Sequence, residues 1–454
     1  METPVEDDDI DWEVEKEVDD VIDSIIEELA SSSDEEEESA PKHGGSRYGR
    51  AKNKDRDYAG AYATVIRDYF SGPQSKYSES DFDRRFRVPR DVFNRIHDKL
   101  MGEWPFVGPL KDAIGRPGIY PLPRLVACFR HIAYGDAYDR EDEYLQISES
   151  SVQVSTKAFV KLIKEHFPEY LNRCPSEQEK AAISNFNASR GFPGLFASWD
   201  CKHFVWHRCP MRWQGQYKGH AEGGRMTLIL EAIADYNKYI WYANFGDAGS
   251  QNDINVLDKS SIVGAMINGS FNTTIPEYTI NGTNRDWLYF LADGIYPEWA
   301  IFVKTYSDPT IDKHRTFAKH QEGVRKDVEC AFGILVAKFH ILQRPLRGWY
   351  VEEIIDLLHC CIILHNMVVE YYGDEYLEKE AAAQDFAERE QKDRSWPLFG
   401  GAVVPEEILL ADGAEVFAAR VAAFNSAMTG DIQHYKLKHD LTEHVYSKFG
   451  SSST

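Results

Sequence analysis

The sequence has little of what a secreted or membrane-spanning protein needs. Its seven cysteines are odd in number and follow no regular spacing, so they indicate no disulfide framework. No apolar signal peptide opens the chain, and no uninterrupted apolar stretch approaches the roughly 20 residues that cross a bilayer. We therefore expect a soluble protein of a reducing, intracellular compartment without a membrane partner.

Basic residues are scarce at the start of the chain, where the first 40 positions hold 19 acids and one lysine. This segment carries a charge of −18 out of the total of −23, so the acidic balance is the property of a tail. Between residues 200 and 350, by contrast, 17 Lys and Arg stand against 16 Asp and Glu. The composition therefore leaves a nucleic-acid substrate open for that part of the chain.

Composition and periodicity divide the chain into four segments. Residues 1–56 form an acidic, disordered tail with a basic linker, 57–190 are helical, 191–372 mix strands and helices, and 373–454 are a polar helical extension. Within the tail, Val18 to Leu29 is either solvated chain or a short helix that docks on a partner. The basic linker fits a nuclear address, a phosphate-binding arm or a counterweight to the acids.

The helical segment contains a pattern typical of a helix-turn-helix unit. Residues 141–163 predict two helices around a short polar turn, and the second helix, 152–163, has the length to enter a major groove. Its side chains expected to be exposed are Gln153, Ser155, Lys157 and Lys161. Any small helical bundle has such turns, so periodicity alone does not decide between DNA binding and packing.

Strand signals begin near residue 194. Apolar, β-branched and aromatic runs predict strands at 195–206, 225–235 and 239–246, the last two joined as a hairpin. A short helix near residue 252, a buried strand at 287–293, and helices at about 315–340 and 351–371 follow. This order predicts an α/β fold with a mixed sheet of the ribonuclease-H-like kind, preceded by an all-α helix-turn-helix domain.

Three acidic residues lie where carboxylates distant in sequence can converge. Asp200 is in the first strand, Asp293 ends a later strand before a glycine, and Glu329 flanks the apolar stripe of a helix. Carboxylate oxygens suit Mg²⁺ or Mn²⁺, and two such ions about 4 Å apart can act on a phosphodiester. The pattern predicts metal-assisted phosphoryl chemistry with two ions held by these three acids.

Neighbouring residues have both a structural and a functional interpretation. Arg325, one turn before Glu329, supplies a phosphate-pairing charge or a surface salt bridge with that acid. Asp253, at the start of a predicted helix, either caps the helix or acts beside the metals or DNA. His203 is expected to pack or to hydrogen-bond beside Asp200.

A loop after the first strand combines aromatic and basic residues. Its members are Trp206, Arg208, Arg212, Trp213, Tyr217 and Lys218. Such a loop either stacks on unpaired bases or packs on itself. The cysteines and histidines of 201–209 are too far apart along an extended strand to share one zinc ion.

Longer blocks of sequence are similar to a known family. These blocks are WDCKHFVWHRCP, GQYKG, LEAIADYNKYIWYANFGDAGSQNDINVLDKS, YFLADGIYPEWAIFVKT, FAKHQEGVRKDVECAFGILVAKF and CIILHNMVVE. In this order, from about residue 80 to 370, the chain resembles the PIF/Harbinger transposases, and HYKLKHDLTEHVY resembles their closing segment. The resemblance implies a DDE nuclease with Asp200, Asp293 and Glu329 as its catalytic, metal-binding triad.

The resemblance also implies how the protein works. It assigns 57–190 to DNA binding at transposon terminal repeats, 191–372 to the nuclease, and the protein to the nucleus. Similar proteins often need a separately encoded Myb-like DNA-binding partner. A homodimer or larger assembly is expected because two element ends must be paired.

One departure from the family is visible at Cys330, where an arginine usually follows the catalytic glutamate. By helix angle this side chain points away from Glu329, so we expect tuned rather than abolished activity. Two alternatives remain open: a domesticated DNA-binding or chromatin adaptor that does not cut, and a ribonuclease acting on RNA–DNA hybrids.

Overall fold

A computed structural model describes residues 54–108, 111, 115, 117–219, 222–373 and 431–450. The chain separates into two units, residues 1–55 and 56–454, and the elements given below belong to the second unit. The acidic tail with its Val18–Leu29 island, and most of the predicted C-terminal extension, lie outside the described residues.

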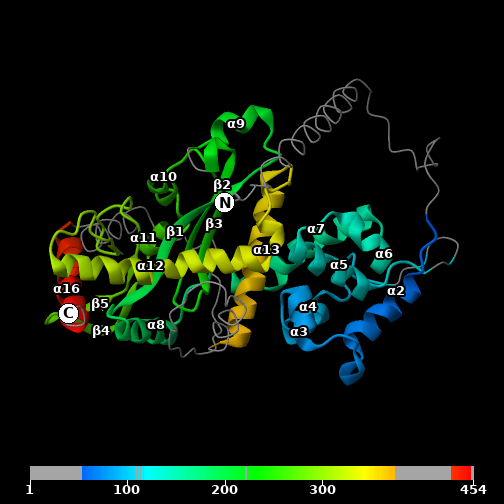
Figure 1. The fold of residues 1–454 in the computed structure, drawn as a ribbon, viewed down its shortest axis with the longest axis horizontal. Helices are drawn as coiled ribbons and strands as arrows, with labels where there is room; N and C mark the ends of the chain where they lie inside the picture. Colours follow the sequence, from blue (N-terminus) through cyan, green and yellow to red (C-terminus); the bar gives the residue numbers. More distant parts are fainter. Residues whose placement is uncertain are drawn as a thin grey trace, which may run out of the picture. The chain divides into compact units, whose positions relative to one another are not determined.

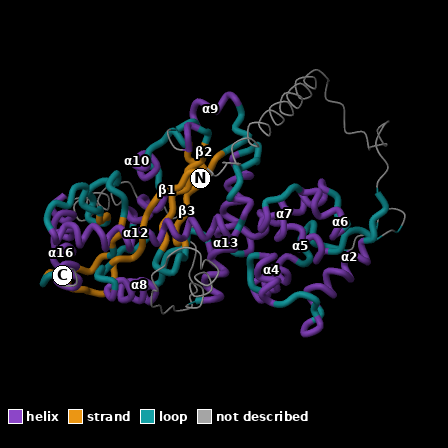
Figure 2. Tube along the Cα trace, in the orientation of Figure 1, coloured by secondary structure: helices purple, strands orange, loops and turns teal. Residues whose placement is uncertain are grey.

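A mixed sheet with the strand order β3-β2-β1-β6-β7 forms the centre of the described residues (Figure 2). Its strands are β1 (Leu195–Val205), β2 (Thr227–Ala234), β3 (Ile240–Ala248), β6 (Tyr289–Leu291) and β7 (Phe302–Val303). The first three are antiparallel neighbours, whereas β6 runs parallel to both β1 and β7. The predicted strands and the predicted α/β class are confirmed.

A separate hairpin, β4 (Thr274–Ile280) with β5 (Thr283–Trp287), precedes β6. No strand was predicted here, because most residues of this hairpin are polar and are not buried. Short helices lie in the same part of the chain: α9 (Met211–Tyr217), α10 (Asp253–Leu257) and α11 (Ser261–Asn268).

Two long helices pack against the sheet (Figure 1). α12 (Asp312–Lys338) contacts β1, β2 and β6, and α13 (Val351–Tyr372) contacts β3 on one side and the helical region on the other. The predicted stripe of α12 is buried, namely Val324, Val328, Phe332, Leu335 and Phe339. Because this stripe faces the sheet, it fixes the rotation of α12 and hence the position of Glu329 on its flank.

The apolar composition of α13 reflects burial in the protein. By length and composition alone, this 22-residue helix could cross a membrane. However, 67% of its most apolar stretch is buried inside the protein. Asn366, fully buried on α13, accepts from the N–H of Ile240 at 2.9 Å and donates to the carbonyl of the same residue at 2.8 Å. We therefore describe α13 as a core helix between the sheet and the helical region.

The helical region precedes the sheet. Its elements include α2 (Tyr58–Val65), α3 (Glu79–Phe86), α4 (Arg90–Leu100), α5 (Pro121–Tyr134), α6 (Glu141–Leu145), α7 (Glu149–His166) and α8 (Glu177–Ser189). As predicted from its sequence, α5 begins at a proline and ends before Gly135, which adopts a φ of 62°. The predicted apolar positions from Phe82 to Leu100 are buried and pack as a cluster of aromatic rings and aliphatic side chains.

The two helices of the predicted helix-turn-helix are α6 and α7, joined at Gln146 in a left-handed conformation. One detail of the prediction was wrong: Ser155 is 1% exposed, because it lies on the face of α7 that packs against α5. Lys161 is exposed, whereas Lys157 donates to Glu353 of α13 at 2.7 Å. Part of the basic face of α7 therefore already has an acidic neighbour.

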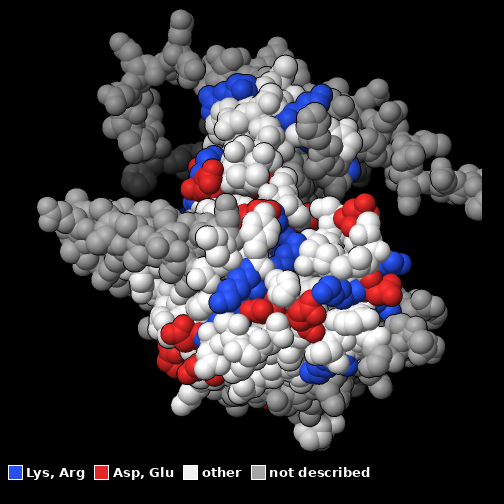
Figure 3. Space-filling model, turned by 90° about the vertical axis from the view of Figure 1, so that its left-hand side faces the viewer, with Lys and Arg blue, Asp and Glu red and all other residues white. Residues whose placement is uncertain are grey.

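The helix α16 (Asp431–Phe449) belongs to the core and packs against α12, β4 and β7. Leu437, Leu441 and Val445 are fully buried, and Asp440 forms an ion pair of 2.5 Å with the buried Arg285 of β5. The surface at the end of the molecule where α16 lies carries acidic and basic side chains interspersed (Figure 3). This face is therefore not a patch of one charge sign.

Candidate active site

Asp200 and Asp293 lie on neighbouring parallel strands. Ser198 of β1 pairs with Leu291 of β6, and each acid lies two residues further along its chain. Asp200 is therefore within β1, while Asp293 follows the end of β6. The sheet topology thus gives two acids that are 93 positions apart in the sequence equivalent positions after a paired Ser198 and Leu291.

Arg325 connects Asp200 with Glu329. Its guanidinium lies 3.1 Å from Oδ2 of Asp200 and 2.5 Å from Oε1 of Glu329, one turn later on α12. The Arg325 and Asp200 side chains are 19% and 17% exposed, whereas Glu329 is 40% exposed. The salt-bridge alternative for Glu329 is therefore the one that this structure has, with Arg325 as the partner, and the same guanidinium also reaches Asp200 on the strand.

The environment of Asp200 disfavours its charged form. Its pKa is raised to about 6, mainly by burial and in smaller part by the carboxylates of Glu329 and Asp253. The backbone N–H of Cys201, at 2.9 Å, and the charge of Arg325 oppose this shift without cancelling it. Asp200 is therefore held in a site that would gain stability from an additional cation.

Asp253 occupies the first position of α10, and its charge acts on Asp200. The helix is capped by Asn252, whose side chain accepts from the N–H of Asn255 at 2.9 Å, so the predicted capping role of Asp253 was wrong. Burial raises the pKa of Asp253, and the charge of Asp293 raises it further, while His203 lowers it. The Asp253 carboxylate is thus electrostatically coupled to the predicted site.

His203 and Asp293 are each held by a local partner. The Nδ1 atom of His203 lies 2.9 Å from the hydroxyl of Thr227 on β2. Asp293 is exposed and accepts from the N–H of Gly294 at 2.6 Å. This bond fixes one carboxylate oxygen of Asp293 to the turn after β6.

A buried ion cluster positions the helix that carries Glu329. Asp327, two residues before Glu329, accepts from Lys238 and from Arg190, each at 2.6 Å. Asp327 and Lys238 are 4% and 6% exposed. This cluster ties α12 to the β2–β3 turn and to the end of α8. This cluster was not predicted, because an acid next to the apolar stripe of a helix has no sequence signature of its own.

The predicted aromatic-basic loop is largely packed. Trp206 is fully buried, donates to the carbonyl of Gly348 at 2.8 Å and lies 4.9 Å from the Tyr217 ring. Arg208 is half-buried, and only Arg212 and Lys218 are exposed among the predicted basic residues of this loop. The packed interpretation of the aromatic residues is therefore confirmed for Trp206.

The donor chemistry of the site suits a hard divalent cation, but the arrangement in this conformation does not complete a coordination shell. Asp200, Asp253, Asp293 and Glu329 supply only oxygen donors. Within the described residues, however, no three His, Cys, Asp or Glu side chains lie close enough to share an ion. Arg325 lies between two of the carboxylates, so a metal ion would have to displace its guanidinium.

Comparison with known proteins supports a transposase-related family. Residues 168–376 match a family model described as plant transposon protein, and residues 62–101 match a model of a domain of unknown function. No curated protein and no solved structure matches the chain. The first match includes β1, β6 and α12, so the acidic site lies within the part related to transposon proteins.

Proposed function

We propose that this protein is a transposon-derived DNA nuclease and strand-transfer enzyme of the DDE class, similar to the PIF/Harbinger transposases. Asp200, Asp293 and Glu329 are its triad, and Mg²⁺ or Mn²⁺, as two ions, is its cofactor. The observation that carries the proposal is the meeting of Asp200 from β1 and Glu329 from α12 on Arg325, inside the segment that matches transposon proteins. The charge of Asp253 from α10 acts on Asp200, and the charge of Asp293 acts on Asp253.

In this proposal, Asp200, Asp293 and Glu329 would hold the divalent cations, which would supply polarisation of the phosphodiester and activation of the attacking oxygen. Asp200 provides a fixed carboxylate on a strand, and Glu329 provides a more exposed carboxylate on a packed helix. Arg325 leaves the two acids when a cation binds and then pairs with a DNA phosphate, for which its planar guanidinium is suited. His203, held by Thr227, lowers the pKa of Asp253 and so favours the charged form of that carboxylate.

The partners follow from the same proposal. The helical region, with Lys157 and Lys161 of α7, binds transposon terminal repeats, and Arg208, Arg212 and Lys218 contact DNA near the cut. In the proposed function the protein acts in the nucleus and forms a homodimer that holds two DNA ends. It acts together with a Myb-like partner protein. The ribonuclease-H-like character of the sheet is part of the proposal, and its three-strand meander followed by parallel strands supports it.

A nicking assay tests the nuclease. We expect the wild type to nick plasmid DNA carrying the element ends when Mg²⁺ or Mn²⁺ is present. Asp200→Asn, Asp293→Asn and Glu329→Gln should each reduce nicking by at least about 1,000-fold, the scale of losing one member of a catalytic set. DNA binding in EDTA should be unchanged.

The exposed Asp286 on β5 provides the matched control, because Asp286→Asn removes an acid from outside the site. Nicking by any triad variant at the wild-type rate would refute the assignment of that residue. Nicking by the wild type in EDTA would refute the metal requirement.

The second candidate function is a domesticated adaptor that binds DNA or chromatin without cutting. The observation that favours it is Arg325, which already neutralises Asp200 and Glu329 within the protein. A wild-type protein that binds the element ends but makes no nick with either metal ion would favour this function over the nuclease.

A further inference from the structure

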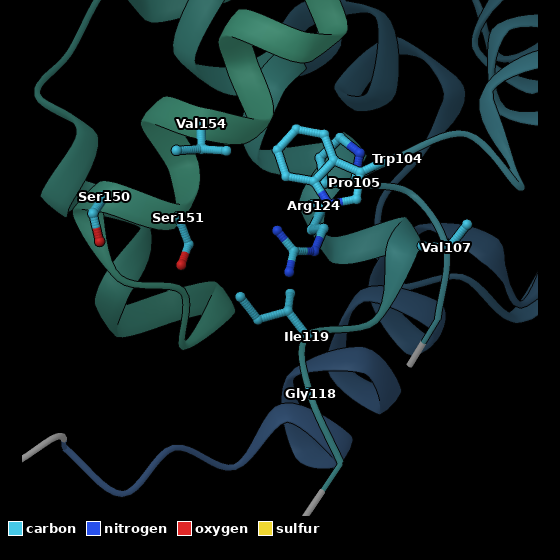
Figure 4. A pocket seen from close by; sticks show the side chains of 9 residues that line it. All are labelled: Trp104, Pro105, Val107, Gly118, Ile119, Arg124, Ser150, Ser151 and Val154. Carbon is cyan, nitrogen blue, oxygen red and sulfur yellow. The ribbon is translucent and has the colours of Figure 1, made fainter. Parts of the chain in front are cut away.

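A cavity of about 370 Å³ lies in the helical region, far along the chain from the acidic site. It is formed by the segment after α4, by the start of α5 and by the first turns of α7. Figure 4 shows the Arg124 guanidinium pointing into the space between Trp104 and Ile119, with Ser151 and Val154 across from it. Its volume is in the range of cavities that bind small organic ligands.

Arg124 has no acidic partner among the described residues. Its Nη1 atom donates to the hydroxyl of Ser155 at 3.0 Å, and its buried Nε atom has no hydrogen-bond acceptor within this described part of the chain. The Ser155 hydroxyl in turn donates to the carbonyl of Ser151 at 2.7 Å. These two hydrogen bonds fix the guanidinium of Arg124 against α7. Burial lowers the pKa of Arg124, and no carboxylate of the described residues offsets that cost. Arginine is nevertheless charged at every physiological pH, so the site holds an unneutralised cation.

The residues that line the cavity around Arg124 suit a ligand that carries both an anionic group and an aromatic ring. Trp104 is 63% exposed at the rim, although tryptophan is usually buried, and its ring is available for stacking. Ser150 and Ser151 place hydroxyl groups at the first turn of the 18-residue α7, where the helix dipole also favours an anion. Glu149, the acid of that turn, is exposed and does not line the cavity.

We propose that this cavity binds one nucleotide of a DNA strand, with the base stacked on Trp104 and the phosphate paired with Arg124. The guanidinium gives the phosphate a bidentate partner, and the serine hydroxyls donate to its remaining oxygens. A nucleoside phosphate is the shared chemistry. That the nucleoside phosphate belongs to a DNA strand rests on the proposed function. The observations on Arg124, which has no carboxylate partner among the described residues, and on the exposed indole of Trp104 are independent of it.

The test measures binding of a fluorescent oligothymidylate of about 12 nucleotides to the full-length protein in EDTA, where no nuclease activity contributes. We expect Trp104→Ala and Arg124→Gln each to weaken binding by about fivefold or more. Arg124→Gln should also reduce the slope of log affinity against log salt by about 0.7, because one phosphate contact is lost. Arg84→Gln, which removes an exposed arginine paired with Asp81 in the same region, should change neither quantity.

Three results would overturn the proposal. The first is wild-type affinity in both variants. The second is binding of free thymidine monophosphate as tightly as the oligonucleotide, which would assign the cavity to a free nucleotide. The third is an acidic peptide that binds more tightly than DNA and displaces the oligonucleotide from the wild type but not from Arg124→Gln. This result would assign the cavity to a protein partner. Failure of the nicking assay leaves this test intact, because binding is measured without metal.

Discussion

Arg325 and Arg124 are both partly buried arginines, yet the protein surrounds them differently. Arg325 in the sheet region contacts two carboxylates, at 3.1 and 2.5 Å. Arg124 in the helical region contacts one serine hydroxyl and no carboxylate among the described residues. A buried charge is costly unless it is paired, so the first arginine is satisfied within the fold, whereas the second, which has no carboxylate partner among the described residues, would gain from an anionic ligand.

The difference suggests that the sheet region and the helical region bind different ligands. The sheet region combines excess acid with an internal cation, as expected for a site that exchanges that cation for a metal ion. The helical region exposes an uncompensated cation next to an aromatic ring, as expected for a site that takes a phosphate and a base. Both ideas depend on the cost of unpaired charge, and that cost can be measured.

The largest effect is expected from breaking a fully paired cluster. Asp327→Asn leaves the buried Lys238 and Arg190 without their shared carboxylate, and should lower the free energy of unfolding by about 3–5 kcal/mol. Urea denaturation measures this change. Asp312→Asn on the same helix is the control, because Asp312 is 82% exposed. Equal stability of the two variants would show that paired buried charges do not hold α12 in place.

A smaller effect is expected from a buried acid on β2. Glu231 is fully buried and accepts from the indole N–H of Trp199 at 3.0 Å, and burial raises its pKa to about 7. Between about pH 4.5 and about pH 7 the folded protein therefore binds a proton that the unfolded chain releases, so the contribution of this group to stability falls as pH rises.

Glu231→Gln removes this pH dependence and keeps the acceptor for Trp199. We expect the variant to exceed the wild type by about 1–3 kcal/mol near pH 8 and to match it near pH 4.5. Urea denaturation at both pH values measures the difference, with the exposed Glu277→Gln as control. A variant less stable than wild type near pH 8 would show that the charged carboxylate is fully compensated.

The smallest effect concerns the internal cation itself. Arg325→Gln removes the competitor for Asp200 and Glu329, so Mn²⁺ affinity, measured by calorimetry, should rise by about three- to tenfold, equivalent to an ion pair worth about 1 kcal/mol. Arg315→Gln on the same helix, where Arg315 pairs with the exposed Asp312, should leave the affinity unchanged. Weaker Mn²⁺ binding by Arg325→Gln would show that this arginine supports the metal site.

Local patterns in the sequence predicted much of this fold. Periodicity placed β1, β2, β3 and the core stripe of α12, because burial on one face of a strand or helix imposes a repeat that neighbouring residues display. The polar hairpin of β4 and β5 was missed, since most of its residues are not buried.

The sequence by itself determined the strands β1, β2, β3 and β6 and the helix α12. It also determined that Asp200, Asp293 and Glu329 occupy a strand, a strand end and a helix flank, and that the acidic balance belongs to a tail. Only the tertiary structure decided that Arg325 bridges two of those acids, that Asn252 rather than Asp253 caps α10, and that Arg124 faces a cavity beside Trp104. The physical reason is range. Periodicity is set by neighbours along the chain, whereas the pairing of charges depends on which distant segments the core brings within a few ångströms.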